Sequence, residues 1–312
     1  MSPTVSNCLA NRQPGTTHHR FTAFALLLSG SLLASIGLPA IAWADSVTLH
    51  PYSMKVVRGQ ASKTSVAPLA SDDRVGQTSQ VWSPAPGTSW QIQLQGTLDT
   101  SLNVGMYDID LFDTPASVID NLKSRNIAVI CYFSAGSWED WRSDAGQIPA
   151  SVRGASNGWP GEQWLDISAI DALAPVMAAR LDLAVARGCD GVDPDNVDGY
   201  TNRTGFPLTA QHQLDYNKWL AAEAHARSLS IGLKNNLLQV EELEPYFDWA
   251  LNESCLQYDE CDLLTPFVDA GKAVFGIEYL DDPADFCSAT NAMNFDWLKK
   301  PWDLTATRES CR

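Results

Sequence analysis

The sequence predicts an α/β protein whose main domain is a (β/α)8 TIM barrel. Eight short apolar runs follow one another between residues 90 and 299, and helical patterns separate several of them. This alternation of strand and helix indicates a parallel sheet. Eight such rounds over roughly 200 residues match the length of one barrel.

The predicted strands are short runs with an apolar centre. In chain order they cover residues 90–94, 104–110, 127–133, 191–196, 231–236, 249–253, 273–279 and 295–299. Helical patterns cover residues 115–125, 170–187, 209–228 and 263–270. Pro115 after Thr114, and Thr209 before a long amphipathic run, are typical helix starts.

A doubly wound parallel sheet is the main alternative architecture. Such a sheet usually carries a glycine-rich phosphate loop after its first strand. Here the first predicted strand is followed by Gln-Gly-Thr-Leu-Asp at 95–99, which is no such loop. The pattern therefore favours the barrel.

Residues 1–44 form a predicted signal peptide. Arg12 and Arg20 precede an apolar run, which ends in Ala-Trp-Ala at 42–44, a small-residue cleavage site. The alternative is a membrane anchor, because the run approaches spanning length. Pro39 and the cleavage site favour removal, and no second run of this kind follows. We expect a secreted or periplasmic protein with no membrane span after cleavage.

Residues 45–87 differ from the chain that follows. Short alternating stretches are interrupted by polar residues, and Ser-Pro-Ala-Pro-Gly at 83–87 is a linker signal. So short a segment cannot bury a core of its own. We expect an N-terminal arm or β-module remnant plus a linker, with the barrel domain at 88–312.

Cysteine usage agrees with export. Cys8 lies in the predicted signal peptide, which leaves an even number of cysteines. Cys255–Cys261 is the easiest local pair, and we expect Cys131–Cys189 and Cys287–Cys311 for the rest. A zinc site is the alternative, but the sequence has no CxxC motif and no paired histidines at metal-ligand spacing.

The charge balance restricts the binding partners. The chain has 21 Lys and Arg against 37 Asp and Glu, a formal net charge of −16. Such a surface repels phosphate backbones, so we expect no nucleic-acid partner. It would attract a cationic substrate instead.

Polar side chains cluster where the predicted strands end. These residues are Asp108, Asp110, Tyr132, Asp195, Asn196, Lys234, Asn235, Glu253, Glu278 and Tyr279. In a barrel they converge on one mouth. One protonated and one ionised carboxylate there suffice to hydrolyse a glycosidic bond.

Other hydrolytic chemistries fit the sequence less well. No histidine lies at a predicted strand end, and no G-x-S-x-G elbow is present. This disfavours a Ser-His-Asp triad and the usual His/Asp pattern of metal-assisted hydrolysis. We expect neither a metal nor another cofactor.

Several motifs in register resemble glycoside hydrolase family 114, the endo-α-1,4-polygalactosaminidases. They are VICYFSAGS (129–137), WPGEQWLDI (159–167), GCDGVDPDNVDGY (188–200), NRTGF (202–206), GLKN (232–235), NESC (252–255) and GKAVF (271–275). The resemblance covers about residues 89–295. It implies a (β/α)8 barrel that cleaves α-1,4-linked, galactosamine-containing exopolysaccharide internally.

By this resemblance the catalytic pair falls on Asp195 and Glu253. We assign Asp195 as nucleophile and Glu253 as acid/base, because Glu253 lies near bulky groups that raise a carboxyl pKa. The alternative for both is a buried ion pair with Lys234. The resemblance favours retention, although the carboxyl separation that decides between retention and inversion cannot be read from sequence.

The other strand-end residues are expected to bind sugar or to support those that do. Asp108 and Asp110 would accept hydrogen bonds from hydroxyls or an ammonium, Tyr132 and Tyr279 would offer ring faces, and Glu278 would contact an amino group or orient Lys234. Asn196, Lys234 and Asn235 complete the expected set.

The sequence therefore predicts an exported, monomeric, endo-acting glycoside hydrolase with a cationic galactosamine polysaccharide as substrate. Two alternatives stay open: a catalytically silent polysaccharide-binding barrel, and a hydrolase of another α-linked glycan.

Overall fold

The computed structural model describes residues 81–279 and 281–312. The predicted signal peptide and most of the predicted arm lie outside the described residues. None of the described helices combines the length and apolar character needed to cross a membrane.

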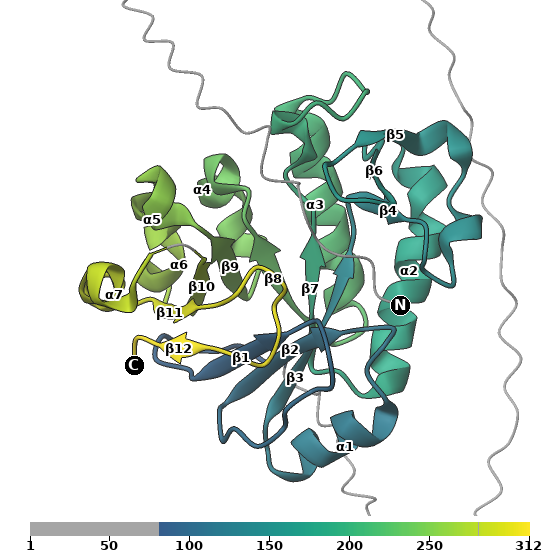
Figure 1. Cartoon of the computed structure of the whole chain (residues 1–312). Coiled ribbons are helices and arrows are strands. Elements are labelled where there is room, and N and C mark those ends of the chain that lie inside the picture. The colour runs from purple at the N-terminus through teal and green to yellow at the C-terminus, as the bar shows by residue number, and fades with distance from the viewer. Residues whose placement is uncertain (1–80, 280) are drawn as a thin grey trace, which may run out of the picture. The chain divides into compact units, whose positions relative to one another are not determined.

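Eight parallel strands form the predicted (β/α)8 barrel (Figure 1). In spatial order they are β1 (Trp90–Gln93), β2 (Met106–Asp110), β3 (Ala128–Ser134), β7 (Gly191–Asp195), β8 (Ser230–Lys234), β9 (Trp249–Glu253), β10 (Val274–Glu278) and β11 (Asp296–Lys299). Each matches one of the eight predicted runs. Because parallel strands share one direction, their last residues gather at the same end of the barrel.

The C-terminal residues 300–312, here called the C-terminal strap, close the barrel between β11 and β1. Its strand β12 (Glu309–Ser310) pairs antiparallel with β11. On the other side, Leu94 N–H donates to Leu304 O at 3.0 Å, and Gln91 donates to Ala306 O at 2.8 Å. The strap thus stands where a direct β11–β1 ladder would close the sheet.

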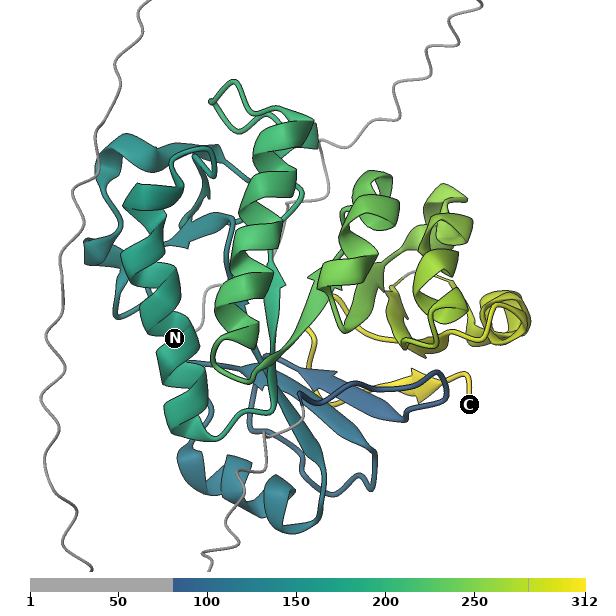
Figure 2. The same ribbon diagram turned by 180° about the vertical axis from the view of Figure 1, so that it is seen from behind.

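Helices cover the outer face of the sheet, as Figures 1 and 2 show from opposite sides. The helices are α1 (Ala116–Ser124), α2 (Ile170–Arg187), α3 (Ala210–His225), α4 (Val240–Leu243), α5 (Cys255–Tyr258), α6 (Thr265–Asp269) and α7 (Pro283–Ala292). Short 3-10 turns are η1 (Ala145–Gln147), η2 (Ala150–Val152), η3 (Gly199–Thr201), η4 (Leu237–Gln239), η5 (Glu244–Tyr246) and η6 (Cys261–Leu264). Thr209 caps α3 as predicted, since its side chain accepts a hydrogen bond from His212 N.

A small antiparallel sheet was not predicted. Its strands β4 (Ser137–Glu139), β6 (Glu162–Leu165) and β5 (Arg153–Ser156) pair in that order between β3 and α2 in the chain. Arg142 ties this insertion to the barrel by contacting Glu139 at 2.9 Å and Asp110 at 2.8 Å. The insertion therefore extends the end of the barrel where β3 finishes.

Apolar side chains fill both the interior of the barrel and the layer between strands and helices. Trp90, Trp249 and Phe275 pack inside the barrel. The centroid of the Phe275 ring lies 5.0 Å from that of Trp90 and 5.6 Å from that of Trp249. A Cβ on Gly232 would lie 2.3 Å from the Trp249 ring. Only glycine leaves room for the indole at this place, which explains the glycine inside β8.

All three expected disulfides are present: Cys131–Cys189, Cys255–Cys261 and Cys287–Cys311. The last one ties α7 to the C-terminal strap. Disulfides of this kind are typical of proteins in oxidising compartments.

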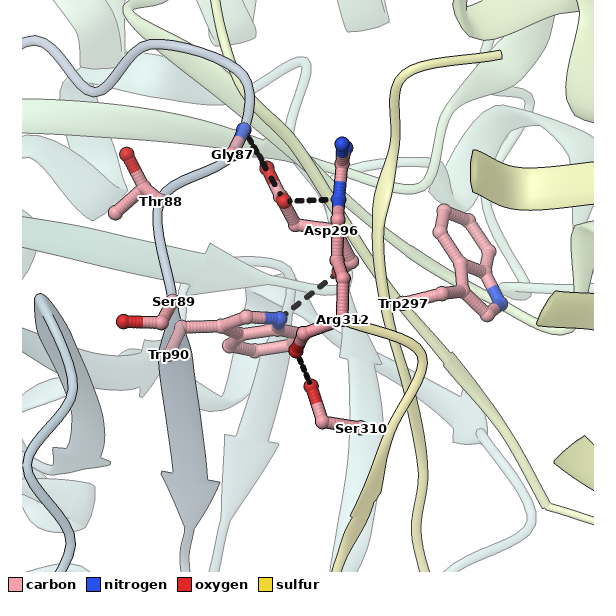
Figure 3. A pocket seen from close by; sticks show the side chains of 8 residues that line it. All are labelled: Gly87, Thr88, Ser89, Trp90, Asp296, Trp297, Ser310 and Arg312. Carbon is pink, nitrogen blue, oxygen red and sulfur yellow. Dashed lines mark hydrogen bonds and ion pairs between the residues drawn. The ribbon is translucent and has the colours of Figure 1, made fainter. Parts of the chain in front are cut away.

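A hollow of about 110 Å³ lies at the amino ends of β1 and β11 (Figure 3). The Asp296 carboxylate at its side accepts a hydrogen bond from Gly87 N–H at 2.9 Å and forms an ion pair with Arg312 at 2.9 Å. This contact holds the last residue of the predicted linker against the barrel, at the end opposite to the strand-end carboxylates.

Candidate active site

Three neighbouring strands each end in an ionisable residue, and these residues meet. Asp195 ends β7, Lys234 ends β8 and Glu253 ends β9. Lys234 Nζ lies 3.8 Å from Asp195 Oδ1 and 4.0 Å from Glu253 Oε2. The ammonium is buried, whereas the carboxylate side chains are 20% and 27% exposed. A substrate can therefore reach both acids from the solvent side, while the buried lysine contacts them from inside the barrel.

The geometry limits how far the two acids stand apart. Asp195 Oδ1 and Glu253 Oε2 cannot be separated by more than the sum of their two distances to Lys234 Nζ. This limit excludes the widest separations of inverting glycosidases, about 9.5 Å, and includes the 5–5.5 Å of retaining ones.

The backbone turns sharply directly after each of these strand ends. Asn196, Asn235 and Ser254 have φ of 62°, 52° and 67°, in the left-handed region that non-glycine residues rarely adopt. Asn235 Oδ1 also accepts hydrogen bonds from Glu253 N–H at 2.9 Å and from Asn252 at 3.2 Å. These bonds lock the end of β9 to the end of β8, and with it the place of Glu253.

Contacts with the end of β3 fix the position of Asn196. Its backbone oxygen passes so near Gly136 that a Cβ there would lie 1.8 Å away. Ser134 donates a hydrogen bond to Asn196 Oδ1 at 2.7 Å. Glycine at 136 and serine at 134 are thus the residues that let the β3 and β7 ends touch.

Each carboxylate also accepts a hydrogen bond from a tyrosine. Tyr132 donates to Asp195 Oδ2 at 2.9 Å, and Tyr279 donates to Glu253 Oε1. Burial, together with the adjacent carboxylates, raises the pKa of both hydroxyls well above the ordinary value. Both tyrosines therefore keep their protons and act as donors. The ring of Tyr279 stacks on Trp302 of the C-terminal strap, with centroids 4.1 Å apart.

Two buried acids lie behind the site. Asp193 Oδ2 is 3.5 Å from Lys234 Nζ. Burial raises the pKa of Asp193 to about 6, with Lys234 opposing the shift and Asp195 adding to it. Burial, and then the charge of Asp193, raises the pKa of Asp108 well above its ordinary value. This shift favours the neutral form of Asp108, which limits the negative charge buried under the site.

Lys234 stays charged in this setting. Burial disfavours its ammonium, but Asp193, Asp195 and Glu253 outweigh burial and raise its pKa well above the ordinary value. The lysine is thus a permanent cation at the centre of the site.

Besides the buried Lys234, three carboxylates expected to bind substrate are buried in the structure. Asp108 and Glu278 are 0% exposed, and Asp110 is 7% exposed. Arg142 donates to both Asp110 oxygens, at 3.0 and 2.8 Å. Glu278 accepts from Leu256 N–H at 3.0 Å. Asp110 and Glu278 therefore hold backbone segments next to the barrel end, and Glu278 is not among the ion-pair partners of Lys234 within 4.0 Å.

Sequence reasoning assigned no role to three residues near the site. The sequence pattern could have indicated Asp193, because residues 193 and 195 of one strand point to the same face of the sheet. Glu162 of the small sheet accepts from Ser137 at 2.8 Å and Asn157 at 2.6 Å. Its pKa is raised by burial against these bonds, and the charge of Asp195 adds to the shift. Neither Glu162 nor Trp302 lies at the end of a barrel strand, so no strand pattern marked them.

Comparisons with known proteins agree with this geometry. The family model of glycoside-hydrolase family GH114 matches residues 71–312. Ega3 of Aspergillus fumigatus, solved in complex with galactosamine, is 42% identical, with 75% of this chain and 99% of that chain covered and a TM-score of 0.70.

Two further matches are more distant. The glycoside hydrolase domain of PelA from Pseudomonas aeruginosa shares the fold at 13% identity, over 71% of this chain and 98% of that one, with a TM-score of 0.57. An uncharacterized protein of Deinococcus radiodurans is 26% identical over 232 residues, 64% of this chain and 75% of its own length.

Proposed function

Because this chain belongs to glycoside-hydrolase family GH114 and is a glycoside hydrolase, we propose that it cleaves α-1,4 linkages inside galactosamine-rich polysaccharide. The observation that carries the proposal is the pair Asp195 and Glu253, both open to solvent and both within 4.0 Å of Lys234 Nζ. Most glycoside hydrolases cleave the glycosidic bond with two carboxyl groups that lie close enough to flank it.

In the proposed mechanism Asp195 is the nucleophile. Its Oδ1 accepts a hydrogen bond from Asn196 N–H at 2.8 Å, its Oδ2 accepts one from Tyr132, and Lys234 lies beside it. These donors suit an anion that attacks the anomeric carbon. The bond from that carbon to the leaving oxygen breaks as the bond to Asp195 forms.

Glu253 is the proposed acid/base. It gives its proton to the leaving oxygen in the first step and takes one from water in the second. Tyr279 and Lys234 hold its carboxylate from two sides. As Asp195 loses its charge on forming the glycosyl-enzyme, Lys234 remains to stabilise the anionic Glu253, which must then act as a base.

The proposed substrate class rests on similarity and on charge. Ega3 is 42% identical to this chain and was solved with galactosamine. The chain carries a formal net charge of −16, which attracts a polymer whose free amines are protonated. The three disulfides and the apolar N-terminal run support export, so that the enzyme would meet this polymer outside the cytoplasm.

Incubation with partially de-N-acetylated polygalactosamine, followed by mass spectrometry of the products, tests the proposal. We expect internal cleavage into oligomers. Asp195→Asn and Glu253→Gln should lose cleavage almost completely and retain binding, whereas the exposed control Asp269→Asn should cleave like the parent chain. A polymer left intact by the parent chain, or full activity in either variant, would contradict the proposal.

Proton NMR of the first-formed reducing end tests the retaining mechanism separately. The α-anomer should appear first, because two successive inversions restore the configuration. Early β-anomer would show that water, and not Asp195, attacks the sugar.

A further inference from the structure

We propose that Trp302 of the C-terminal strap is a platform on which a sugar ring of the substrate stacks, on the Glu253 side of the site. This inference deepens the proposed function, since it rests on Glu253 acting on a glycosidic bond. It assigns a binding role to a residue outside all eight barrel strands.

The first observation is a short chain of contacts from the acid to the indole. Tyr279 OH donates to Glu253, and the Tyr279 ring stacks on the Trp302 ring at 4.1 Å between centroids and 11° between planes. Tyr279 follows β10, and Trp302 follows β11 by three residues. Trp302 therefore stands at the same end of the barrel as Glu253, one aromatic ring further out.

The second observation is exposure. Trp302 is 53% exposed, whereas Trp90, Trp249 and Trp297 are at most 1% exposed. Since one indole face rests on Tyr279, the exposed area belongs largely to the other face and the edges. Leaving so large an apolar surface in water forgoes the free energy that burial of a tryptophan would contribute. A sugar ring that covers this face would recover part of it.

The third observation is that the indole is held in place before any ligand arrives. Lys300 N–H donates to Glu278 O at 3.0 Å, Leu304 N–H donates to Pro301 O at 3.0 Å, and Lys300 Nζ donates to Thr305 O at 2.6 Å. The turn that carries Trp302 is therefore anchored on both sides. Pre-organised aromatic surface binds with little further loss of conformational entropy.

The chemistry of the occupant follows from the ring. The face of an indole attracts the C–H groups of a pyranose through dispersion, and it attracts an ammonium through its quadrupole. An amino sugar offers both groups. The platform therefore fits a hexosamine unit better than an acidic sugar.

A purely structural role must be separated from binding, because Trp302 also supports Tyr279. If Trp302 only positions Tyr279, its loss should change kcat and the pH profile of cleavage and leave oligosaccharide affinity unchanged. Affinity is therefore measured in the Asp195→Asn background, where no cleavage occurs, by calorimetry with galactosamine oligomers.

In that background, Trp302→Ala should raise the dissociation constant at least about tenfold, and Trp302→Phe should have a smaller effect because a ring remains. Trp302→Leu keeps apolar volume without a ring, and it provides the test if the alanine variant does not fold. Tyr246→Ala is the matched control, because Tyr246 is 43% exposed and precedes β9, at the opposite end of the barrel. Its dissociation constant should stay within twofold of the parent value.

The outcomes separate this inference from the proposed function. If the active chain cleaves galactosamine polymer but Trp302→Ala and Trp302→Leu bind like the parent, the platform is wrong and the function stands. If the active chain cleaves only another α-linked glycan, the same variants are measured with oligomers of that glycan, and an unchanged affinity again overturns the platform. Binding of no glycan would overturn both.

Discussion

At the scale of single residues, the proposed chemistry depends on one buried cation among acids. Lys234 is 2% exposed and faces Asp193, Asp195 and Glu253 within 4.0 Å. Water cannot screen these charges well, so the lysine and the carboxylates depend on one another for their charged states. Removing either kind of partner leaves charge buried without compensation.

Lys234→Met should therefore destabilise the protein by about 3–5 kcal/mol and abolish cleavage. The free energy of unfolding in urea measures the first effect, and product analysis the second. Lys218→Met is a suitable control, because Lys218 contacts the exposed Tyr246 ring at 4.9 Å and lies on the outer helix α3. Equal unfolding free energies for the two variants would contradict this account of Lys234.

Glu278 makes the stability of the fold depend on pH. Burial raises its pKa to about 7, from 4.5 in an unfolded chain, with the hydrogen bond from Leu256 opposing the shift. Between these values the unfolded state loses the proton and the folded state keeps it, so the stability contribution present below pH 4.5 is lost as pH rises to about 7.

Glu278→Gln should remove this loss, because glutamine does not titrate and keeps the oxygen that accepts from Leu256. Relative to the variant, the parent should lose on the order of 3 kcal/mol across that interval. Urea unfolding at several pH values measures it. A constant difference between the two proteins at every pH would refute the argument, and exposed Glu309→Gln should leave the parent's pH dependence unchanged.

At the scale of elements, the C-terminal strap both completes the sheet and carries Trp302. It pairs with β11 through β12, and the Cys287–Cys311 disulfide holds it to α7. This disulfide reduces the conformational entropy of the unfolded chain, and it keeps the strap near the barrel in the folded protein. The strap therefore links the stability of the barrel to the proposed platform.

Replacing Cys287 and Cys311 by serine should lower the unfolding free energy by about 3 kcal/mol and raise KM for the polymer several-fold. The same double replacement at Cys131 and Cys189 is the control. That pair joins β3 to the residues before β7, away from the strap, so it should lower stability without the change in KM. Equal KM values in the two double variants would show that the strap does not contribute to substrate binding.

At the scale of the whole molecule, we expect the net charge of −16 to act on the encounter with the proposed substrate. A cationic polymer is drawn toward an acidic protein over distances set by the ionic strength. The effect concerns the rate of association more than the contacts made in the site.

The value of kcat/KM on de-N-acetylated polymer should therefore fall by roughly tenfold as salt is raised from low to molar concentration. Fully N-acetylated polymer, which is neutral, serves as the matched substrate control wherever it is cleaved. Turnover of the cationic polymer that does not change with salt would remove charge steering from the account.

The eight strands and the local Cys255–Cys261 disulfide follow from the sequence alone, whereas the two longer pairings were expectations that the structure confirms. The sequence also determined that acids stand at the ends of β7 and β9, because strand runs and their ends are local properties of the chain. The regular helices α1, α2 and α3 follow from local periodicity for the same reason. The short α4 and α5, the small β4–β6–β5 sheet and α7 were not predicted, since each depends on packing against the barrel.

Which strand-end acids face solvent depends on packing in three dimensions. Asp110 accepts hydrogen bonds from Arg142, which is 32 residues away in the chain. Glu278 is buried and accepts a hydrogen bond from Leu256 N–H, and Trp302 of the strap stacks on Tyr279. Pairings between distant segments depend on register and on competition for partners in three dimensions. A residue's type and its place along a strand do not contain that information.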